Sequence, residues 1–183
     1  MKKMILIRGC QGSGKSTLAH LFTHENPKSR HYEADRWFMD SNDRYDFCRE
    51  GLTDAHKWCL EAAKRALHND QVDLVVVSNC FAKVEQLRPY LVEASLAGAK
   101  SVVYVCCGDY PNVHNVPEKA VADTRNAMEP LVGERINGSR NADIDRLVAM
   151  YPKYRGIAVG LENIDKVERI PVIRAIGTKE ESK

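Results

Sequence analysis

Short, nearly continuous apolar segments alternate with longer segments of helical periodicity along much of the chain. The apolar segments are Met4–Arg8, Val72–Val77 and Ser101–Cys106. Runs of this kind, rich in β-branched residues, are typical of strands that are buried on both faces of a parallel sheet. Because helices must then cover both faces, the pattern predicts a doubly wound α/β fold with a mainly parallel sheet of about five strands flanked by helices.

The helical segments and two weaker strands complete the expected order of elements. Helices are expected at Lys15–Phe22, Leu52–Leu67, Val84–Ala97, Pro117–Met128 and Ala142–Met150, and the weaker strands at Arg30–Glu33 and Val167–Ile173. Pro89 is compatible with the third of these helices, because a proline in a first turn costs no hydrogen bond. We therefore expect one domain over residues 1–176, a helical lid at about 109–141 and a charged tail at 177–183.

The charge of the chain is nearly balanced, and this limits its partners. With 27 Lys and Arg against 25 Asp and Glu, the 183-residue chain has a formal net charge of +2. No global field therefore attracts it to nucleic acid or anionic lipid, and a polyanion must be held by a local site. The apolar runs are also far shorter than the roughly 20 residues of a membrane span, so we expect no membrane association.

The cysteines and the N-terminal segment both indicate the cytoplasm. The six cysteines have no C-x-x-C spacing, which is typical of reduced thiols and not of a disulfide framework. The first apolar segment leads into glycines instead of a signal-peptide cleavage site. We expect a cytoplasmic protein, while the sequence leaves the oligomeric state open.

A glycine-rich loop is the clearest chemical motif in the chain. Residues 9–16 fit G-x-x-x-x-G-K-[ST] in full, after an apolar strand and before a helix. Backbone N–H groups in such a loop bind phosphates, the lysine reaches the transferring phosphate, and the hydroxyl binds Mg²⁺. A turn that only connects strand to helix rarely meets all four specified positions by chance. The residues assigned to the nucleotide are Gly9, Gln11, Gly12, Ser13, Gly14, Lys15, Ser16 and Thr17.

Asp35 is a candidate on the opposite side of the reaction. It follows the second predicted strand, and in a doubly wound sheet that end of the strand faces the same crevice as the phosphate loop. A carboxylate at this place can take the proton from an attacking hydroxyl. A turn or helix-capping aspartate is the alternative, and residue type alone does not separate the two.

Six segments, in this order along the chain, carry a resemblance to a known family. They are Gly9–Thr17, Glu33–Asp40, Tyr45–Phe47, Leu52–Cys59, Val75–Asn79 and Arg88–Tyr90. Together they resemble the small P-loop kinases related to bacteriophage polynucleotide 5′-hydroxyl kinase and the NEDD4-binding-protein-2-like ATPases, over about residues 1–128. The resemblance implies a P-loop kinase fold, with ATP and Mg²⁺ as the phosphate donor.

The resemblance also gives roles to residues of the acceptor side. It implies that Lys15 acts on the donor, that Asp35 is the catalytic base, and that Arg36 holds the acceptor's phosphate, although an exposed arginine can also be merely solvated. Trp37 is a candidate for stacking on a base, together with neighbouring aromatic residues. The alternative is a loop that is packed onto the domain by its own aromatic side chains, which are Tyr32, Trp37, Phe38, Tyr45 and Phe47.

The sequence departs from the family at the metal site. Family members have an aspartate directly after the third strand, where this chain has Ser78. The outer-sphere ligand of Mg²⁺ is therefore expected to be weakened to a hydroxyl and the neighbouring Asn79, with Ser16 as the direct ligand.

A second departure lies in the predicted lid. The element before Pro117 keeps His114 but lacks the arginine that family members carry there. Arg125 is therefore assigned as the catalytic cation, with Arg135 and Arg140 as lid candidates, because phosphoryl transfer gains from a guanidinium on the developing charge. His114 either contacts phosphate or acceptor, or packs within its loop.

These observations lead to one functional expectation with two alternatives. We expect a Mg-ATP-dependent kinase that transfers the γ-phosphate to a polynucleotide hydroxyl, in particular a 5′-hydroxyl end. The first alternative keeps the chemistry but uses a nucleotide, a hydroxymethylated DNA base or another small alcohol as acceptor. The second is an accessory protein that binds or hydrolyses ATP without an acceptor.

Overall fold

The computed structural model describes residues 2–24, 26–42, 44–106, 110 and 116–129, and the backbone of 156–157. The expected helix at Ala142–Met150, the expected strand at Val167–Ile173 and the charged tail at 177–183 lie outside the described residues. So does most of the expected lid, including His114, Arg135 and Arg140.

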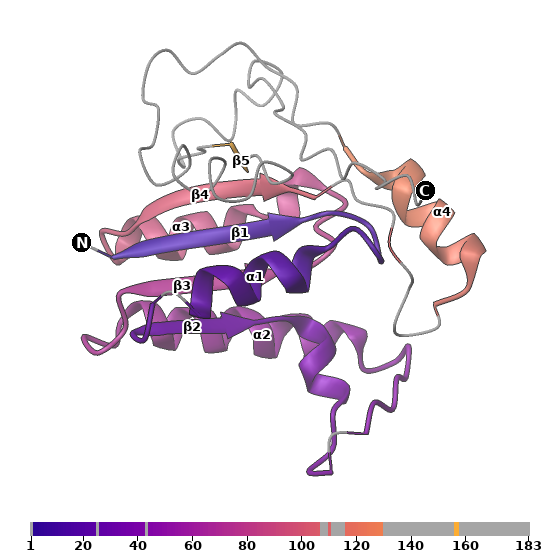
Figure 1. Ribbon diagram of the computed structural model, residues 1–183, viewed down its shortest axis with the longest axis horizontal. Coiled ribbons are helices and arrows are strands. Elements are labelled where there is room, and N and C mark those ends of the chain that lie inside the picture. The colour runs from indigo at the N-terminus through magenta and orange to yellow at the C-terminus, as the bar shows by residue number, and fades with distance from the viewer. Residues whose placement is uncertain are drawn as a thin grey trace, which may run out of the picture.

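A mainly parallel sheet forms the centre of the structure, as predicted. Its order is β2-β3-β1-β4-β5, and the parallel strands are β1 (Lys3–Arg8), β2 (Ser29–Tyr32), β3 (Leu74–Ser78) and β4 (Lys100–Val105). The short strand β5 (Gly156–Ile157) pairs antiparallel with β4, and no strand was expected there. All four parallel strands end at one edge of the sheet, which Figure 1 shows on the right.

Helices cover both faces of this sheet. One face packs against α1 (Lys15–His24), and the other packs against α2 (Leu52–Leu67) and α3 (Arg88–Leu96) (Figure 1). Alternate residues of each strand serve the two cores: in β1, Ile5 and Ile7 face α1, while Met4 and Leu6 belong to the cluster on the other side. This period of two explains why the strands are apolar throughout.

The expected helix at Val84–Ala97 is divided in the structure, and its predicted start is wrong. A 3₁₀ turn, η2 (Val84–Gln86), comes first, and α3 begins at Arg88. Because Pro89 has no N–H, a continuous α-helix would leave the carbonyl four residues earlier without its bond. The Gln86 side chain instead closes the tight turn by accepting the N–H of Lys83 at 3.0 Å.

Two further elements lie at the carboxyl ends of the strands. The segment after β2 forms a 3₁₀ helix, η1 (Ala34–Phe38), where the sequence indicated irregular structure from Asp35 onward. Helix α4 (Glu118–Ala127) lies to one side of the sheet, beyond the strand ends (Figure 1). None of the helices in the described ranges is both long enough and apolar enough to span a bilayer.

Candidate active site

The phosphate loop is tightly packed against the end of β4 and the segment that follows it. A Cβ atom on Gly9 would lie 2.4 Å from the carbonyl oxygen of Cys106, and one on Gly12 would lie 2.6 Å from that of Tyr110. Gly12 also has a φ of +72°, which favours glycine. Gly9 and Gly12, two of the three glycines of the loop, are therefore required by close backbone approach as well as by conformation.

The Lys15 side chain folds back over the phosphate loop. Its Nζ donates to the carbonyl oxygen of Cys10 at 2.7 Å, so the ammonium is held over the loop from which it comes. The first turn of α1 carries no acidic residue, and its N–H groups and positive dipole end therefore favour an anion. The predicted loop-to-helix arrangement for phosphate binding is present in the geometry.

Glu33 is a site residue that sequence reasoning missed. It directly follows β2, and its Oε2 atom accepts two hydrogen bonds, from Ser16 Oγ at 3.0 Å and from Ser78 Oγ at 2.9 Å. Only 18% of its side chain is exposed. The available signal was its position, because a carboxylate at the end of a parallel strand faces the same edge as the phosphate loop. Glu33 thus supplies a carboxylate beside Ser78, where the family has an aspartate.

A histidine orients this hydroxyl and carboxylate pair. His31 Nε2 lies 2.7 Å from Ser78 Oγ, and because Ser78 donates its one proton to Glu33, Nε2 is the donor to Ser78. Burial lowers the pKa of His31 from 6.5 to about 4, although the nearby Glu33 carboxylate acts to raise it. His31 is therefore neutral at physiological pH, which suits its role as a fixed donor.

The lowered pKa of His31 predicts a pH-dependent stability. Between pH 6.5 and about 4, the unfolded chain binds a proton on His31 more readily than the folded chain does. The contribution of His31 to the free energy of unfolding is therefore complete above pH 6.5 and is lost as the pH falls to about 4. The loss is on the order of 3 kcal/mol. Urea unfolding with a chelator, at about pH 7 and about pH 4.5, should show this loss in the wild type. The loss should be smaller in His31→Gln, and equal pH dependence in the two proteins would contradict the assignment.

The charges of Asp35 and Lys15 both act on one thiol, that of Cys80. Asp35 is exposed in the first turn of η1. Cys80, just beyond the end of β3, has a pKa that burial raises, that the Lys15 charge lowers and that the Asp35 charge raises. Both charges therefore lie within electrostatic reach of the Cys80 thiol.

Asn79 holds η1 in place instead of serving as a metal ligand. Its Oδ1 atom accepts the backbone N–H of Ala34 at 2.8 Å, and its Nδ2 atom lies 3.5 Å from Cys59 Sγ. Both ends of the amide are thus engaged in buried contacts. The expectation that Asn79 helps to bind the metal is not supported by this geometry, because its carbonyl oxygen positions the residue next to Asp35.

The aromatic residues around Asp35 divide into two groups. Phe38, Tyr45 and Phe47 pack on one another, with ring centroids 5.0 to 6.4 Å apart, and so hold the loop onto the domain. Trp37 is separate from them: 45% of it is exposed, and its ring lies 6.2 Å from that of Trp58. Trp37 keeps a surface that a base can reach, and so does Phe47, which is 50% exposed although its ring packs on Phe38 and Tyr45.

The cationic candidates occupy different positions. Arg36 is half-exposed, and its Nε lies 3.8 Å from Glu33 Oε1, so its charge is next to the Glu33 carboxylate. Arg125 is in the last turn of α4, and the preceding Thr124 Oγ1 lies 3.5 Å from Gln11 Nε2 of the phosphate loop. The structure thus brings the helix that carries Arg125 next to the phosphate loop.

A buried arginine, which the sequence did not single out, holds the base of this helix. Arg8 is 1% exposed at the end of β1, and its Nη2 donates to Ala82 O at 3.0 Å and lies 2.9 Å from Met128 Sδ. Glu129 completes the junction: its N–H donates to Ala82 O at 2.8 Å, and its carboxylate accepts the N–H of Val84 at 2.7 Å. The end of α4 is therefore fixed to the loop after β3.

The oxygen atoms at the strand ends fit a magnesium ion carried by a nucleotide. Within the described ranges, no three His, Cys, Asp or Glu side chains gather as a metal-binding group. Mg²⁺ in a nucleotide site needs fewer protein ligands, because phosphates and waters supply the rest. The hydroxyl oxygens of Ser16 and Ser78 lie 3.0 and 2.9 Å from Glu33 Oε2, so three oxygen atoms that can bind a metal are grouped at this place.

Comparisons with known proteins agree with the family that the sequence resembles. No family model matches the chain. NEDD4-binding protein 2 of Homo sapiens is 31% identical over 88 residues, which is 48% of this chain and 5% of the human protein. A fungal RNA kinase structure has a TM-score of 0.51 at 12% identity, covering 91% of this chain and 94% of that one. An APS kinase structure from Mycobacterium tuberculosis has a TM-score of 0.45 at 16% identity, covering 69% and 96%.

The match to NEDD4-binding protein 2 agrees with the predicted resemblance. The fungal RNA kinase structure confirms the α/β fold, with parallel strands flanked by helices. It spans only 5% of the length of the human relative that it matches, and at 12% identity the fungal structure is evidence of the fold alone.

Proposed function

We propose that this protein is a Mg-ATP-dependent kinase that transfers the γ-phosphate of ATP to a hydroxyl group, with the 5′-hydroxyl end of a polynucleotide as acceptor. One observation carries the proposal: Glu33, two residues before Asp35, accepts a hydrogen bond at 3.0 Å from Ser16 of the phosphate-loop motif, so the segment that carries Asp35 lies against the donor side. A phosphate donor site with a carboxylate nearby is what alcohol phosphorylation needs.

The donor half of the site binds and neutralises the triphosphate. Backbone N–H groups of residues 12–16 would hold the β- and γ-phosphates, and Lys15 would exchange its bond with Cys10 O for the transferring phosphate. When bound, Mg²⁺ neutralises charge on the β- and γ-phosphates. Ser16, Ser78 and Glu33 are the side chains that would hold it.

The acceptor half activates the hydroxyl. Asp35 would accept the proton as the hydroxyl oxygen forms its bond to the γ-phosphorus, while the bond between that phosphorus and the β–γ bridging oxygen breaks and ADP leaves. Arg36 would hold a phosphate of the acceptor, and Arg125 would approach the transferring group. Catalysis then rests on positioning and electrostatics, with no covalent enzyme intermediate.

Glu33 would replace the family aspartate that is absent at Ser78. Glu33 follows β2 and accepts hydrogen bonds from Ser78, at the end of β3, and from Ser16, on α1. Ser78 would then link His31 to the Glu33 carboxylate, and Glu33 would be the acidic group of the metal site. Partners that orient metal ligands typically change metal affinity about 10- to 100-fold when they are replaced. The acidic group of the metal site would therefore come from the end of β2, at Glu33, and not from the end of β3, at Ser78.

This arrangement predicts a metal phenotype for Glu33→Gln. The Mg²⁺ concentration needed for half-maximal binding of a fluorescent ATP analogue should rise about tenfold or more. Binding without Mg²⁺ should change much less, because the amides and Lys15 remain. Glu85→Gln, a matched change at an exposed residue of η2, should titrate like the wild type. Identical Mg²⁺ titrations of Glu33→Gln and the wild type would contradict a metal role for Glu33.

Two relatives support the choice of acceptor. A fungal RNA kinase structure is similar over 91% of this chain, and the resemblance found in the sequence includes a polynucleotide 5′-hydroxyl kinase. A panel assay tests the choice: label from γ-labelled ATP should appear on 5′-hydroxyl DNA or RNA, and not on nucleosides, nucleotides or hydroxymethylated duplex. ATP consumption without label on any acceptor would contradict the kinase and favour an accessory ATPase.

A further inference from the structure

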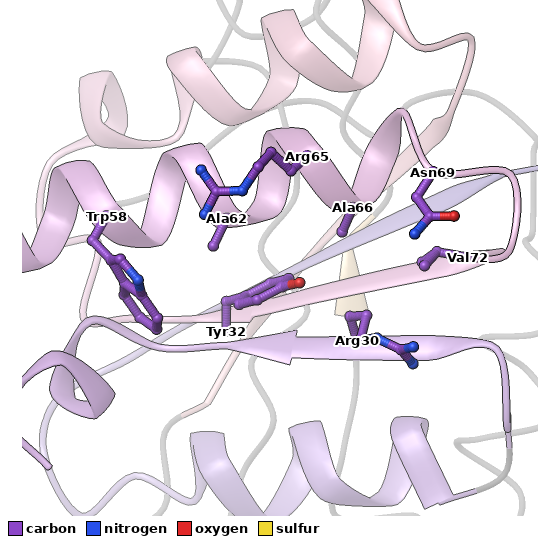
Figure 2. A pocket seen from close by; sticks show the side chains of 8 residues that line it. All are labelled: Arg30, Tyr32, Trp58, Ala62, Arg65, Ala66, Asn69 and Val72. Atoms are coloured by element: carbon purple, nitrogen blue, oxygen red, sulfur yellow. The ribbon is translucent and has the colours of Figure 1, made fainter. Parts of the chain in front are cut away.

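A pocket lies between the edge strand β2 and helix α2, beyond the residues already assigned. Arg30 and Tyr32 come from β2, and Trp58 and Arg65 come from α2 (Figure 2). Asn69 and Val72 close its far end. The cavity has a volume of about 270 Å³ and belongs neither to the phosphate loop nor to the carboxylates at the strand ends.

The lining of this pocket is basic and aromatic. Its two charged residues are both arginines, and none of the eight lining residues is acidic. Both guanidinium groups act on the same phenol: burial raises the pKa of Tyr32, and the charges of Arg30 and Arg65 lower it. Arg30 and Arg65 are exposed, so their charges are available to an anion that enters from solvent. Two cations next to two aromatic rings suit a ligand that carries both phosphates and planar bases.

Ring contacts connect the pocket with Trp37, a residue of the proposed acceptor site. The Trp58 ring lies 6.5 Å from that of Tyr32 and 6.2 Å from that of Trp37, and Trp37 is two residues after Asp35. A row of three aromatic rings thus joins the pocket to Trp37, on the 3₁₀ helix that carries Asp35. Trp58 and Arg65 lie about two turns apart on α2, and Figure 2 shows the Arg65 side chain directed back along the helix toward Ala62, while Arg30 comes from β2.

We propose that this pocket binds the single-stranded polynucleotide next to its 5′ end, with bases against Trp58 and Tyr32 and phosphates against Arg30 and Arg65. The inference rests on the proposed function, because it extends the same acceptor away from Asp35. The proposal also explains how a protein with a net charge of only +2 could bind a polyanion. A strand that lacks a global attraction to the protein needs a local group of cations, and the pocket provides one.

Direct binding tests the subsite without any turnover. The probe is single-stranded octathymidylate with a free 5′-hydroxyl and a fluorophore at its 3′ end. In Arg30→Gln/Arg65→Gln its dissociation constant should rise about tenfold or more, and the slope of log affinity against log salt should fall by about 1.4, since each phosphate contact contributes about 0.7. Wild-type affinity and salt slope in the double variant would overturn the proposal.

Lys64→Gln is the matched control. It removes one positive charge from the same helix, next in sequence to Arg65, but Lys64 faces α3, where its Nζ lies 3.1 Å from Glu93 Oε1. The dissociation constant for octathymidylate should stay within about twofold of the wild type. A loss equal to that of the double variant would show that net charge, and not the pocket, binds the strand, and would overturn the proposal.

Tryptophan fluorescence locates the bound strand. The chain has two tryptophans, so Trp37→Phe leaves Trp58 as the only one. Octathymidylate should quench Trp58, and the quenching should disappear in the variant that also lacks Arg30 and Arg65. Strand binding without any quenching of Trp58 would overturn the proposal.

The failure of the subsite differs from the failure of the proposed function. If octathymidylate binds through the two arginines but no 5′-hydroxyl is phosphorylated, the subsite stands and the kinase assignment fails. If the 5′-hydroxyl is phosphorylated and the double variant has the wild-type KM for octathymidylate, the kinase stands and the subsite fails. With a working subsite, the decrease of KM with acceptor length should disappear in the double variant.

Discussion

Replacing Asp35 with Asn should lower the rate of phosphate transfer to a 5′-hydroxyl acceptor by about 10²-fold or more. The amide is nearly isosteric with the carboxylate and leaves η1 in place, but it cannot accept the proton of the attacking hydroxyl. The N–H of Ala34 that fixes η1 bonds to Asn79, which this change does not touch. Initial rates with γ-labelled ATP and a 5′-hydroxyl oligonucleotide measure the loss.

A second aspartate near the same site provides the control for this experiment. Asp40 follows η1 and is exposed, and its Oδ1 atom accepts the N–H groups of Asn42 and Arg44 at 2.7 and 2.9 Å. These bonds lower the pKa of Asp40 and commit its carboxylate to the turn. Asp40→Asn should keep nearly wild-type rates. Equal rates for Asp35→Asn and the wild type, or equal losses in both variants, would remove Asp35 from the role of base.

Replacing Lys15 with Ala should abolish ATP turnover, with a loss of about 10³-fold or more. The Lys15 ammonium lies over the phosphate loop and is held by Cys10 O at 2.7 Å. Without it, the charge that develops on the transferring phosphate loses its nearest cation on the donor side. Turnover is measured as the release of ADP with saturating acceptor.

Lys57→Ala is the matched change for the lysine experiment. Lys57 is exposed on α2 and pairs with Asp54 at 3.6 Å, so it is away from the phosphate loop and should leave turnover close to that of the wild type. Full ADP release by Lys15→Ala would show that the loop does not act on the transferred phosphate.

Much of the fold could be predicted because the strongest elements carry their signal locally. The strands β1, β3 and β4 are apolar on both faces, and α2 has its apolar residues at helical spacing, so each appears at or near its expected position. Strand β5 has two residues and is defined by its antiparallel pairing with β4. A segment so short has no periodicity of its own. Its partner strand β4 lies about 50 residues earlier in the chain, so the pairing leaves no local signal in the sequence.

Candidate site residues could be proposed from the sequence where a motif is contiguous, but not where distant segments meet. The phosphate loop is one run of residues, and Asp35 was proposed from the rule that strand ends share an edge. Glu33 bonds to Ser16 and Ser78, which are 17 and 45 residues away. Ser78 therefore suggested a weakened metal site on sequence grounds, while the structure places a carboxylate beside it. Arg8 was missed for the same reason, because its contacts with Ala82 and Met128 come from distant parts of the chain.

A crystal structure of the protein with Mg²⁺ and a non-hydrolysable ATP analogue tests the central claim most directly. We expect the β- and γ-phosphates against the amides of residues 12–16, the metal next to Ser16 with Glu33 and Ser78 on its outer side, and the γ-phosphate facing Asp35. A γ-phosphate that points away from Asp35, or a nucleotide bound elsewhere, would contradict the account.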